Sequence, residues 1–238
     1  MTACLPLVLS GPMHAWGTTS RFPRRDTAME PSKSGVLGLL AAAQGRRRTE
    51  EISDLAGLAF GVRVDHPGRL IRDFQTAVRP AQGRGSDVRM PLSERFYVAD
   101  AVYLAVVEGP EGLVDELSRA VRSPRFPLFL GRRSCPPDRP VGLPVAPGAL
   151  EEVLEAHPWL GPERLARRRA RTVSCQVVRD ARPGEKSTSR EPDVPVSFDP
   201  RRREFGWRSV IRTFVDVTNP AGTEARTASP HDPIAELL

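Results

Sequence analysis

Apolar residues follow two spacings along the chain, every second residue in some stretches and about every fourth in others. The run LPLVLSG (5–11) is almost wholly apolar and ends in a turn, which is typical of a buried strand. AFGVRVD (59–65) alternates, and FYVADAVYLAVVEG (96–109) is the clearest strand pattern of the chain. RLIRDFQTA (69–77) follows the turn at HPG, so we expect it to pair with 59–65.

Three segments have the periodicity of helices. In PSKSGVLGLLAAAQG (31–45) we expect a helix over 32–44, with Ser32 as N-cap and Gly45 as its stop. EEISDLAGL (50–58) predicts a short second helix. PEGLVDELSRAVRS (110–123) predicts a third, with one apolar face made of Leu113, Leu117, Ala120 and Val121.

The order of these elements indicates the fold class. Strand, helix, strand, strand and helix, followed by a further strand at 126–130 or 141–145, would complete a ferredoxin-like split βαβ unit. After a polar loop (181–195) we expect a last strand pair near 194–198 and 207–217. The sequence therefore predicts an α+β protein with a C-terminal β extension.

One segment interrupts this order. VRPAQGRGSDVRMPLSER (78–95) is rich in arginine, glycine and proline and has no apolar period, so we expect a loop. Such a long loop in a compact domain is usually functional or disordered. Its arginines Arg79, Arg84 and Arg89 are candidate nucleic-acid contacts.

The charge of the chain favours an anionic partner. Its 238 residues have a net charge of +6, and of its 35 basic residues only Lys33 and Lys186 are lysines. Arginine binds phosphate bidentately and stacks on bases, so an arginine-dominated positive surface favours nucleic acid. A GC-rich genome would explain the preference for arginine over lysine, but not the net positive charge.

Other classes of protein are disfavoured. The three cysteines, at positions 4, 135 and 175, are scattered, which fits a reducing compartment rather than a disulfide framework. Cysteines and histidines lack the spacing of a zinc site, so we expect no metal or other cofactor. No segment resembles a signal peptide or a membrane helix, so we expect a soluble, cytoplasmic protein.

Two motifs remain as candidate RNA-binding sites. A helix N-terminus binds anions, and the predicted one at Ser32, Lys33 and Ser34 follows Arg21, Arg24 and Arg25. The alternative is an ordinary capped core helix. In FPLFLGRRSCPPDRP (126–140), an apolar run ends at a glycine followed by Arg132 and Arg133, which suit phosphates; a solvated surface turn is the alternative. We expect one of these two arginines to face RNA and the other to pair with an acidic group, either internal or on a neighbouring subunit. The reason is that neighbours on an extended segment point to opposite faces.

Six stretches together resemble a known family: LSGPMHAWG, RFPRRDT, PSKSGVLGLLAAAQG, FGVRVD, RDFQTA and PLFLGRRSCPP. They occur in this order in the type I-E branch of the fifth CRISPR-associated protein family, whose members are subunits of the Cascade surveillance complex. The resemblance covers nearly the whole chain. It implies a modified RRM or ferredoxin-like palm, with halves at 1–77 and 96–238, and a thumb inserted at 78–95.

The resemblance also implies a function. Members of this branch bind the 5′ handle of the CRISPR RNA, cap the Cascade backbone, and contact the backbone subunit CasC and the large subunit CasA. They do not cut RNA. A related branch cuts precursor RNA with a Tyr, Lys and His set that we do not find here. Two alternatives stay open: a metal-independent endoribonuclease acting on repeat RNA, and a scaffold that contacts only proteins.

Overall fold

The computed structural model describes residues 1–17, 24–81, 83 and 85–224. Its main sheet has six antiparallel strands in the order β1-β9-β4-β10-β12-β11. These strands are β1 (Thr2–Ser10), β4 (Ala59–His66), β9 (Val102–Pro110), β10 (Thr172–Asp180), β11 (Ser189–Ser197) and β12 (Glu204–Thr218). The coarse prediction of a mixed helix and strand protein with a C-terminal β extension is confirmed.

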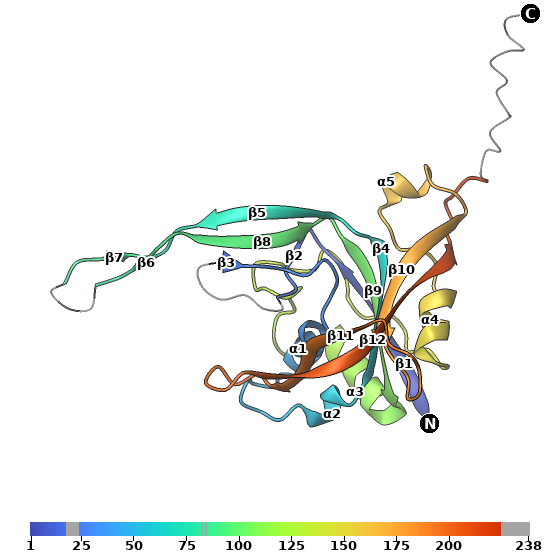
Figure 1. Ribbon diagram of the computed structural model, residues 1–238, viewed down its shortest axis with the longest axis horizontal. Coiled ribbons are helices and arrows are strands. Elements are labelled where there is room, and N and C mark those ends of the chain that lie inside the picture. The colour runs from blue at the N-terminus through green and yellow to red at the C-terminus, as the bar shows by residue number, and fades with distance from the viewer. Residues whose placement is uncertain (18–23, 82, 84, 225–238) are drawn as a thin grey trace, which may run out of the picture.

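Helices cover both faces of this sheet (Figure 1). α1 (Lys33–Gln44) and α3 (Glu111–Arg122) pack on each other and on the face that carries Leu5, Leu7 and Tyr103. α4 (Leu150–Ala156) covers the opposite face, which carries Cys4 and Leu104. Successive strand residues alternate between the two faces because the side-chain period of a strand is two. Two short helices, α2 (Ser53–Ala56) and α5 (Glu163–Ala166), lie at the periphery.

A β arm projects from one end of the main sheet (Figure 1). β5 (Arg69–Gln75) follows β4 and pairs with β8 (Ser93–Ala99), which leads into β9. The chain bends between the paired strands at Gly68 and Asp100, whose φ angles are 67° and 60°. At the tip, β6 (Val78–Arg79) pairs with β7 (Val88–Arg89). At the base, β2 (Met13–His14) and β3 (Arg24–Arg25) add to β8.

Most of the predicted elements are confirmed. The strands predicted at 5–11 and 59–65 are β1 and β4, and the helices predicted at 32–44 and 110–123 are α1 and α3. Ser32 is the N-cap of α1, and Gly45 ends it in the left-handed conformation at φ 82°. The last strand pair is β11 and β12, although β11 begins at Ser189, inside the predicted loop. The helix predicted over 50–58 is only the single turn of α2.

Four predictions about pairing and extent are wrong. Residues 69–77 do not pair with 59–65, because β4 runs on into the arm and both segments pair with the 93–110 segment. The single strand predicted at 96–109 is two strands, the end of β8 and most of β9. Residues 78–95 contain β6, β7 and the start of β8 rather than a structureless loop. Neither 126–130 nor 141–145 is a strand; instead Gly142 and Ala146 make isolated bridges to the free edge of β1.

Candidate nucleic-acid interface

Side chains of the chain itself fill the N-terminus of α1. Ser32 Oγ accepts a hydrogen bond from the backbone N of Gly35 at 3.2 Å, as expected for the cap. Asp193 Oδ2 accepts from the backbone N of Lys33 at 2.7 Å. A carboxylate there satisfies a free N–H and the partial positive charge of the helix end. The prediction that this helix end is open to an external anion is therefore wrong.

The side chain of Lys33 belongs to a buried ionic network. Its Nζ lies 2.9 Å from Asp180 Oδ2, and the side chain is 7% exposed. Arg208 donates to both oxygens of Asp193, at 2.6 and 3.0 Å, and to Asp180 at 2.7 Å. Two cations and two carboxylates thus neutralise one another inside the protein. Lys33 docks α1 onto the C-terminal strands and is not a surface charge.

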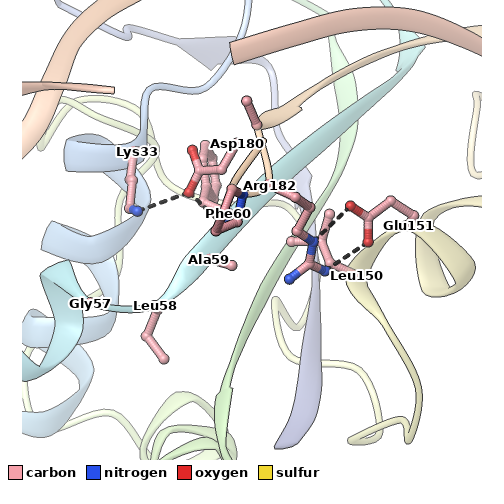
Figure 2. A pocket seen from close by; sticks show the side chains of 11 residues that line it. Lys33, Gly57, Leu58, Ala59, Phe60, Leu150, Glu151, Asp180 and Arg182 are labelled. Atoms are coloured by element: carbon pink, nitrogen blue, oxygen red, sulfur yellow. Dashed lines mark hydrogen bonds and ion pairs between the residues drawn. The ribbon is translucent and has the colours of Figure 1, made fainter. Parts of the chain in front are cut away.

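A small cavity of about 220 Å³ lies beside this network (Figure 2). Arg182 lines it and donates to Glu108 at 2.6 Å and to Glu151 at 2.8 Å. Hydrogen bonding to this guanidinium holds the pKa of both carboxyl groups below their usual range. Lys33 and Asp180, also in the wall, pair with each other. Because the charged groups of the wall are matched in this way, we do not assign an anion site to the cavity.

The loop at residues 130–135 ties the base of the arm to the core. Gly131 has a φ of 86°, and a Cβ there would lie 1.8 Å from the carbonyl O of Ala15, so only glycine fits. Arg132 donates to the carbonyl oxygens of Phe96 at 3.0 Å and Arg25 at 3.0 Å. Its guanidinium also lies 4.8 Å from the ring centre of Tyr97. Arg132 therefore joins β3, β8 and the loop.

The next residue, Arg133, has different surroundings. It is exposed, and no hydrogen bond or ion pair of its side chain is found among the described residues. The structure thus separates the two arginines as predicted. The prediction of an internal acidic partner is wrong for Arg132, because its hydrogen bonds go to backbone carbonyls. An acidic partner on a neighbouring subunit stays a prediction.

Three arginines meet at the base of the arm. Arg25 on β3 is the register partner of Arg95 on β8, and Arg132 bonds the backbone of Arg25. Burial lowers the pKa of Arg25, and the charges of Arg95 and Arg132 lower it further. The Nε of Arg95 is buried and has no hydrogen-bond partner among the described residues. This arginine cluster (Arg25, Arg95 and Arg132) has the charge and the free donor that an anion such as phosphate would satisfy.

Three carboxylates near the cluster offset part of its positive charge. Asp73, which lies opposite Arg95 in the register of β5 and β8, accepts from Gln75 Nε2 at 2.8 Å. Asp26 accepts from Arg24 Nε at 2.8 Å. Glu94 is the register partner of Arg24. The four guanidinium groups of Arg24, Arg25, Arg95 and Arg132 outnumber the three carboxylates, so the base of the arm stays positive.

Aromatic rings and arginines alternate on the arm. The guanidinium of Arg24 lies 4.8 Å from the ring centre of Phe96, and that of Arg72 lies 4.6 Å from the ring centre of Phe74. Phe74 is 49% exposed. Exposed rings beside arginines are the usual contacts of single-stranded nucleic acid, because bases stack on the rings and phosphates pair with the cations. Arg72 and Arg95 are not among the residues predicted from the sequence. The two-residue period of 69–75 and 93–99 could have placed each of them on one face of the arm.

The predicted RNA-binding residues thus lie in three places. Arg24, Arg25, Arg132 and Arg133 come together at the base of the arm. Arg79 and Arg89 are exposed at its tip, in β6 and β7. Ser32, Lys33 and Ser34 belong to the filled helix end, where the hydroxyls of the two serines lie 3.4 Å apart. Arg21 and Arg84 lie outside the described residues.

Two residues of types that can act as catalytic groups, His14 and Tyr103, lie in the core. His14 and Tyr103 are both buried, with ring centres 5.4 Å apart, and the Tyr103 hydroxyl donates to the carbonyl of Met29. Burial lowers the pKa of His14 to about 4 and raises that of Tyr103. In the part of the chain that the structure describes, no three His, Cys, Asp or Glu side chains are grouped to hold a metal. Nor is any described helix long and apolar enough to cross a membrane.

The chain is similar to known proteins over most of its length. Residues 4–211 match the model of the family described as CRISPR-associated protein (Cas_Cas5). The CRISPR system Cascade subunit CasD of Escherichia coli (strain K12) is 35% identical over 160 residues, which are 60% of this chain and 71% of that protein.

Two solved structures share the whole fold. A structure described as a crystal structure of Cas protein has a TM-score of 0.69 and 36% identity, covering 93% of this chain and 98% of its own. A chain of a CRISPR RNA-guided surveillance complex has a TM-score of 0.73 and 31% identity, covering 94% of this chain and 95% of its own. The family match spans most of the chain and includes the arm and the loop at its base, so the chain belongs to the Cas5 family of CRISPR-associated proteins.

Proposed function

We propose that the chain is a non-catalytic subunit of a type I-E Cascade complex, which binds the 5′ handle of the CRISPR RNA and caps the complex backbone in antiviral defence. Its similarity to a Cascade subunit and to a chain of a surveillance complex supports this assignment. Its partners would then be the CRISPR RNA, CasC and CasA, and it would act in the cytoplasm.

The arginine cluster is the observation that carries the RNA-binding part of the proposal. Arg25, Arg95 and Arg132 hold positive charge at the base of the arm, with a buried donor of Arg95 left over. Arg133 lies exposed beside them. A phosphate of the handle would fit the cluster. Phe74 and Phe96 lie on the other face of the arm, where they would stack bases of a strand that passes around it. Binding through phosphates fixes the position of a strand without reading its sequence.

We also propose that the first half of the sheet is a ferredoxin-like or RRM-like palm and that the arm is its thumb. The strand order β1-β9-β4, with α1 and α3 on one face, fits that unit. The segment at 141–146 would take the place of its fourth strand beside β1. The thumb would then run from residue 69 to residue 99 and so extend beyond the insertion at 78–95.

A metal-free incubation with labelled repeat RNA tests the function. The proposal predicts that the purified chain retains the RNA uncut, because His14 and Tyr103 are buried away from any bound strand. Arg133→Gln should weaken retention, and Arg47→Gln, the same change at an exposed arginine far from the arm, should not. Site-specific cutting that a point change abolishes would instead identify an endoribonuclease. If the chain neither retains nor cuts the RNA, it is a scaffold that contacts only proteins.

A further inference from the structure

The hairpin of β11 and β12 carries aromatic side chains that the core does not use. Trp207 is 61% exposed and Phe205 37% exposed. They are two residues apart on one strand and so share a face. The other two tryptophans of the chain, Trp16 and Trp159, are 1% and 5% exposed. Trp207 is therefore the one tryptophan that a ligand in solution can reach.

One arginine contacts this aromatic face and three more lie in the turn beside it. The guanidinium of Arg190 on β11 lies 5.7 Å from the ring centre of Trp207. Three consecutive exposed arginines, at positions 201 to 203, form the turn that leads into β12. The nearby carboxylates are Asp199, which accepts from the backbone N of Arg201 at 2.8 Å, and Glu204, which lies 3.6 Å from Arg202 Nε. Four guanidinium groups against two carboxylates leave the hairpin end positive.

We propose that this face of the β11–β12 hairpin is a second site for single-stranded nucleic acid, with a base stacked on Trp207 and phosphates held by Arg190, Arg202 and Arg203. An exposed indole ring and several arginines are the two elements that such sites combine. The clustered positive charge favours a polyanion over an apolar protein surface. The site is separate from the arm: Figure 1 shows the hairpin and the arm as two projections from the sheet.

Tryptophan fluorescence of the full chain tests the proposal directly. Titration with a 12-residue oligo-rU or oligo-dT should quench part of the tryptophan emission. It should also make the emission of Trp207 that remains less sensitive to quenching by acrylamide. Trp207→Phe should abolish both changes, since the other two indoles are buried. Quenching by rU alone assigns the site to RNA, by dT alone to DNA, and by both to any single strand.

Matched charge changes complete the test. The double change Arg202→Gln and Arg203→Gln should raise the oligonucleotide concentration at which quenching is half complete. It should also reduce the salt slope of binding by up to about 1.4, or about 0.7 for each lost phosphate contact. The pair Arg47→Gln and Arg48→Gln removes the same charge from another exposed arginine pair and should leave the midpoint unchanged. Arg133→Gln should also leave it unchanged, which separates this site from the arm. If neither oligonucleotide quenches Trp207 and only assembly with other subunits protects it from acrylamide, the face binds protein and the proposal is wrong.

Discussion

At the scale of single residues, identical side chains have different roles because their surroundings differ. Arg132 and Arg133 are neighbours in the chain, but one is held by three backbone carbonyls and a ring while the other is exposed. A guanidinium that satisfies buried carbonyls stabilises the fold, since these acceptors would otherwise lose their partners. An exposed guanidinium contributes little to stability and is available to a ligand.

The two arginines should therefore give different phenotypes. We expect Arg132→Ala to lower the free energy of unfolding by about 1–3 kcal/mol, because it leaves partly buried carbonyls without their donor. Arg133→Ala should change stability by less than about 0.5 kcal/mol and reduce the salt slope of RNA binding by about 0.7. Denaturant melts and RNA titrations over a salt series measure both quantities. Equal effects of the two changes in both assays would contradict this division.

His14 should make the stability depend on pH. Burial lowers its folded pKa to about 4, whereas the pKa of a histidine in an unfolded chain is about 6.5. Between these values the unfolded state binds the additional proton, so stability is greatest above about pH 6.5 and falls as the pH drops toward 4, by about 3 kcal/mol.

The pH prediction can be checked with urea midpoints between about pH 4.5 and 8. His14→Gln should flatten the curve. Burial also lowers the pKa of His66, so some slope should remain in the variant. An equally steep curve in the variant would show that His14 is not responsible.

At the scale of elements, charged side chains decide how helices and strands dock. Asp193 on β11 caps α1, and Arg208 on β12 holds Asp193 in place. A helix end that is commonly an anion site here binds a carboxylate of its own chain. The main sheet and the arm also differ: helices cover the main sheet, whereas the arm is a narrow ribbon (Figure 1).

We expect Lys33→Met to affect stability rather than RNA binding. The change leaves Asp180 with one ionic partner fewer in a buried site and should cost about 1–3 kcal/mol. Lys186→Met, at the exposed second lysine, is the matched control and should change little. Melting curves and RNA affinities of both variants decide the matter. Weaker RNA binding by Lys33→Met at unchanged stability would favour the helix end as an RNA contact.

The tip of the arm should exchange its amide hydrogens quickly in the isolated chain. β6 and β7 pair through two residues each and are exposed on both strands. Such short ribbons are marginal without a partner. We expect fast exchange there and slow exchange in β9, and we expect the tip to become protected once it is assembled into Cascade. Strong protection of the tip in the free chain would contradict this.

At the scale of the whole molecule, the chain consists of a covered sheet from which two ribbons project. The sheet and its helices contain the buried core, whereas the arm and the β11–β12 hairpin hold most of the exposed aromatic residues. Stability and binding are thereby placed in different parts of the structure. A change at an exposed position of a ribbon should accordingly alter binding and leave folding intact, whereas Asp193 and Arg208 of the hairpin are buried and belong to the core.

Removing the arm tip tests this separation. Residues 78–89 can be replaced by Asn-Gly, because the backbone N of Met90 already donates to the carbonyl of Ala77 at 2.8 Å, as in a two-residue hairpin. We expect the melting temperature to stay within about 2 °C of the parent and the salt slope of RNA binding to fall by up to about 2, since three arginines are lost. A large drop in melting temperature would mean that the tip contributes to the core.

Several features could be predicted from the sequence because they depend on near neighbours. The helices at 33–44 and 111–122 follow from their apolar faces, and the first begins and ends at the predicted cap and glycine. The strands β1 and β4 follow from apolar runs bounded by turns. The family motifs were likewise visible as continuous stretches.

The tertiary structure alone decided which strands pair and whether each charged side chain is buried, paired or exposed. That β4 and β5 share one partner ribbon depends on contacts between residues 18 to 49 positions apart, which no local pattern contains. Lys33 is buried because Asp180 and Asp193 reach it from strands near the other end of the chain. Arg95 becomes part of a cluster because β3 and the loop at Arg132 fold against β8. Electrostatic roles depend on the distances between charges, and only the folded chain sets those distances.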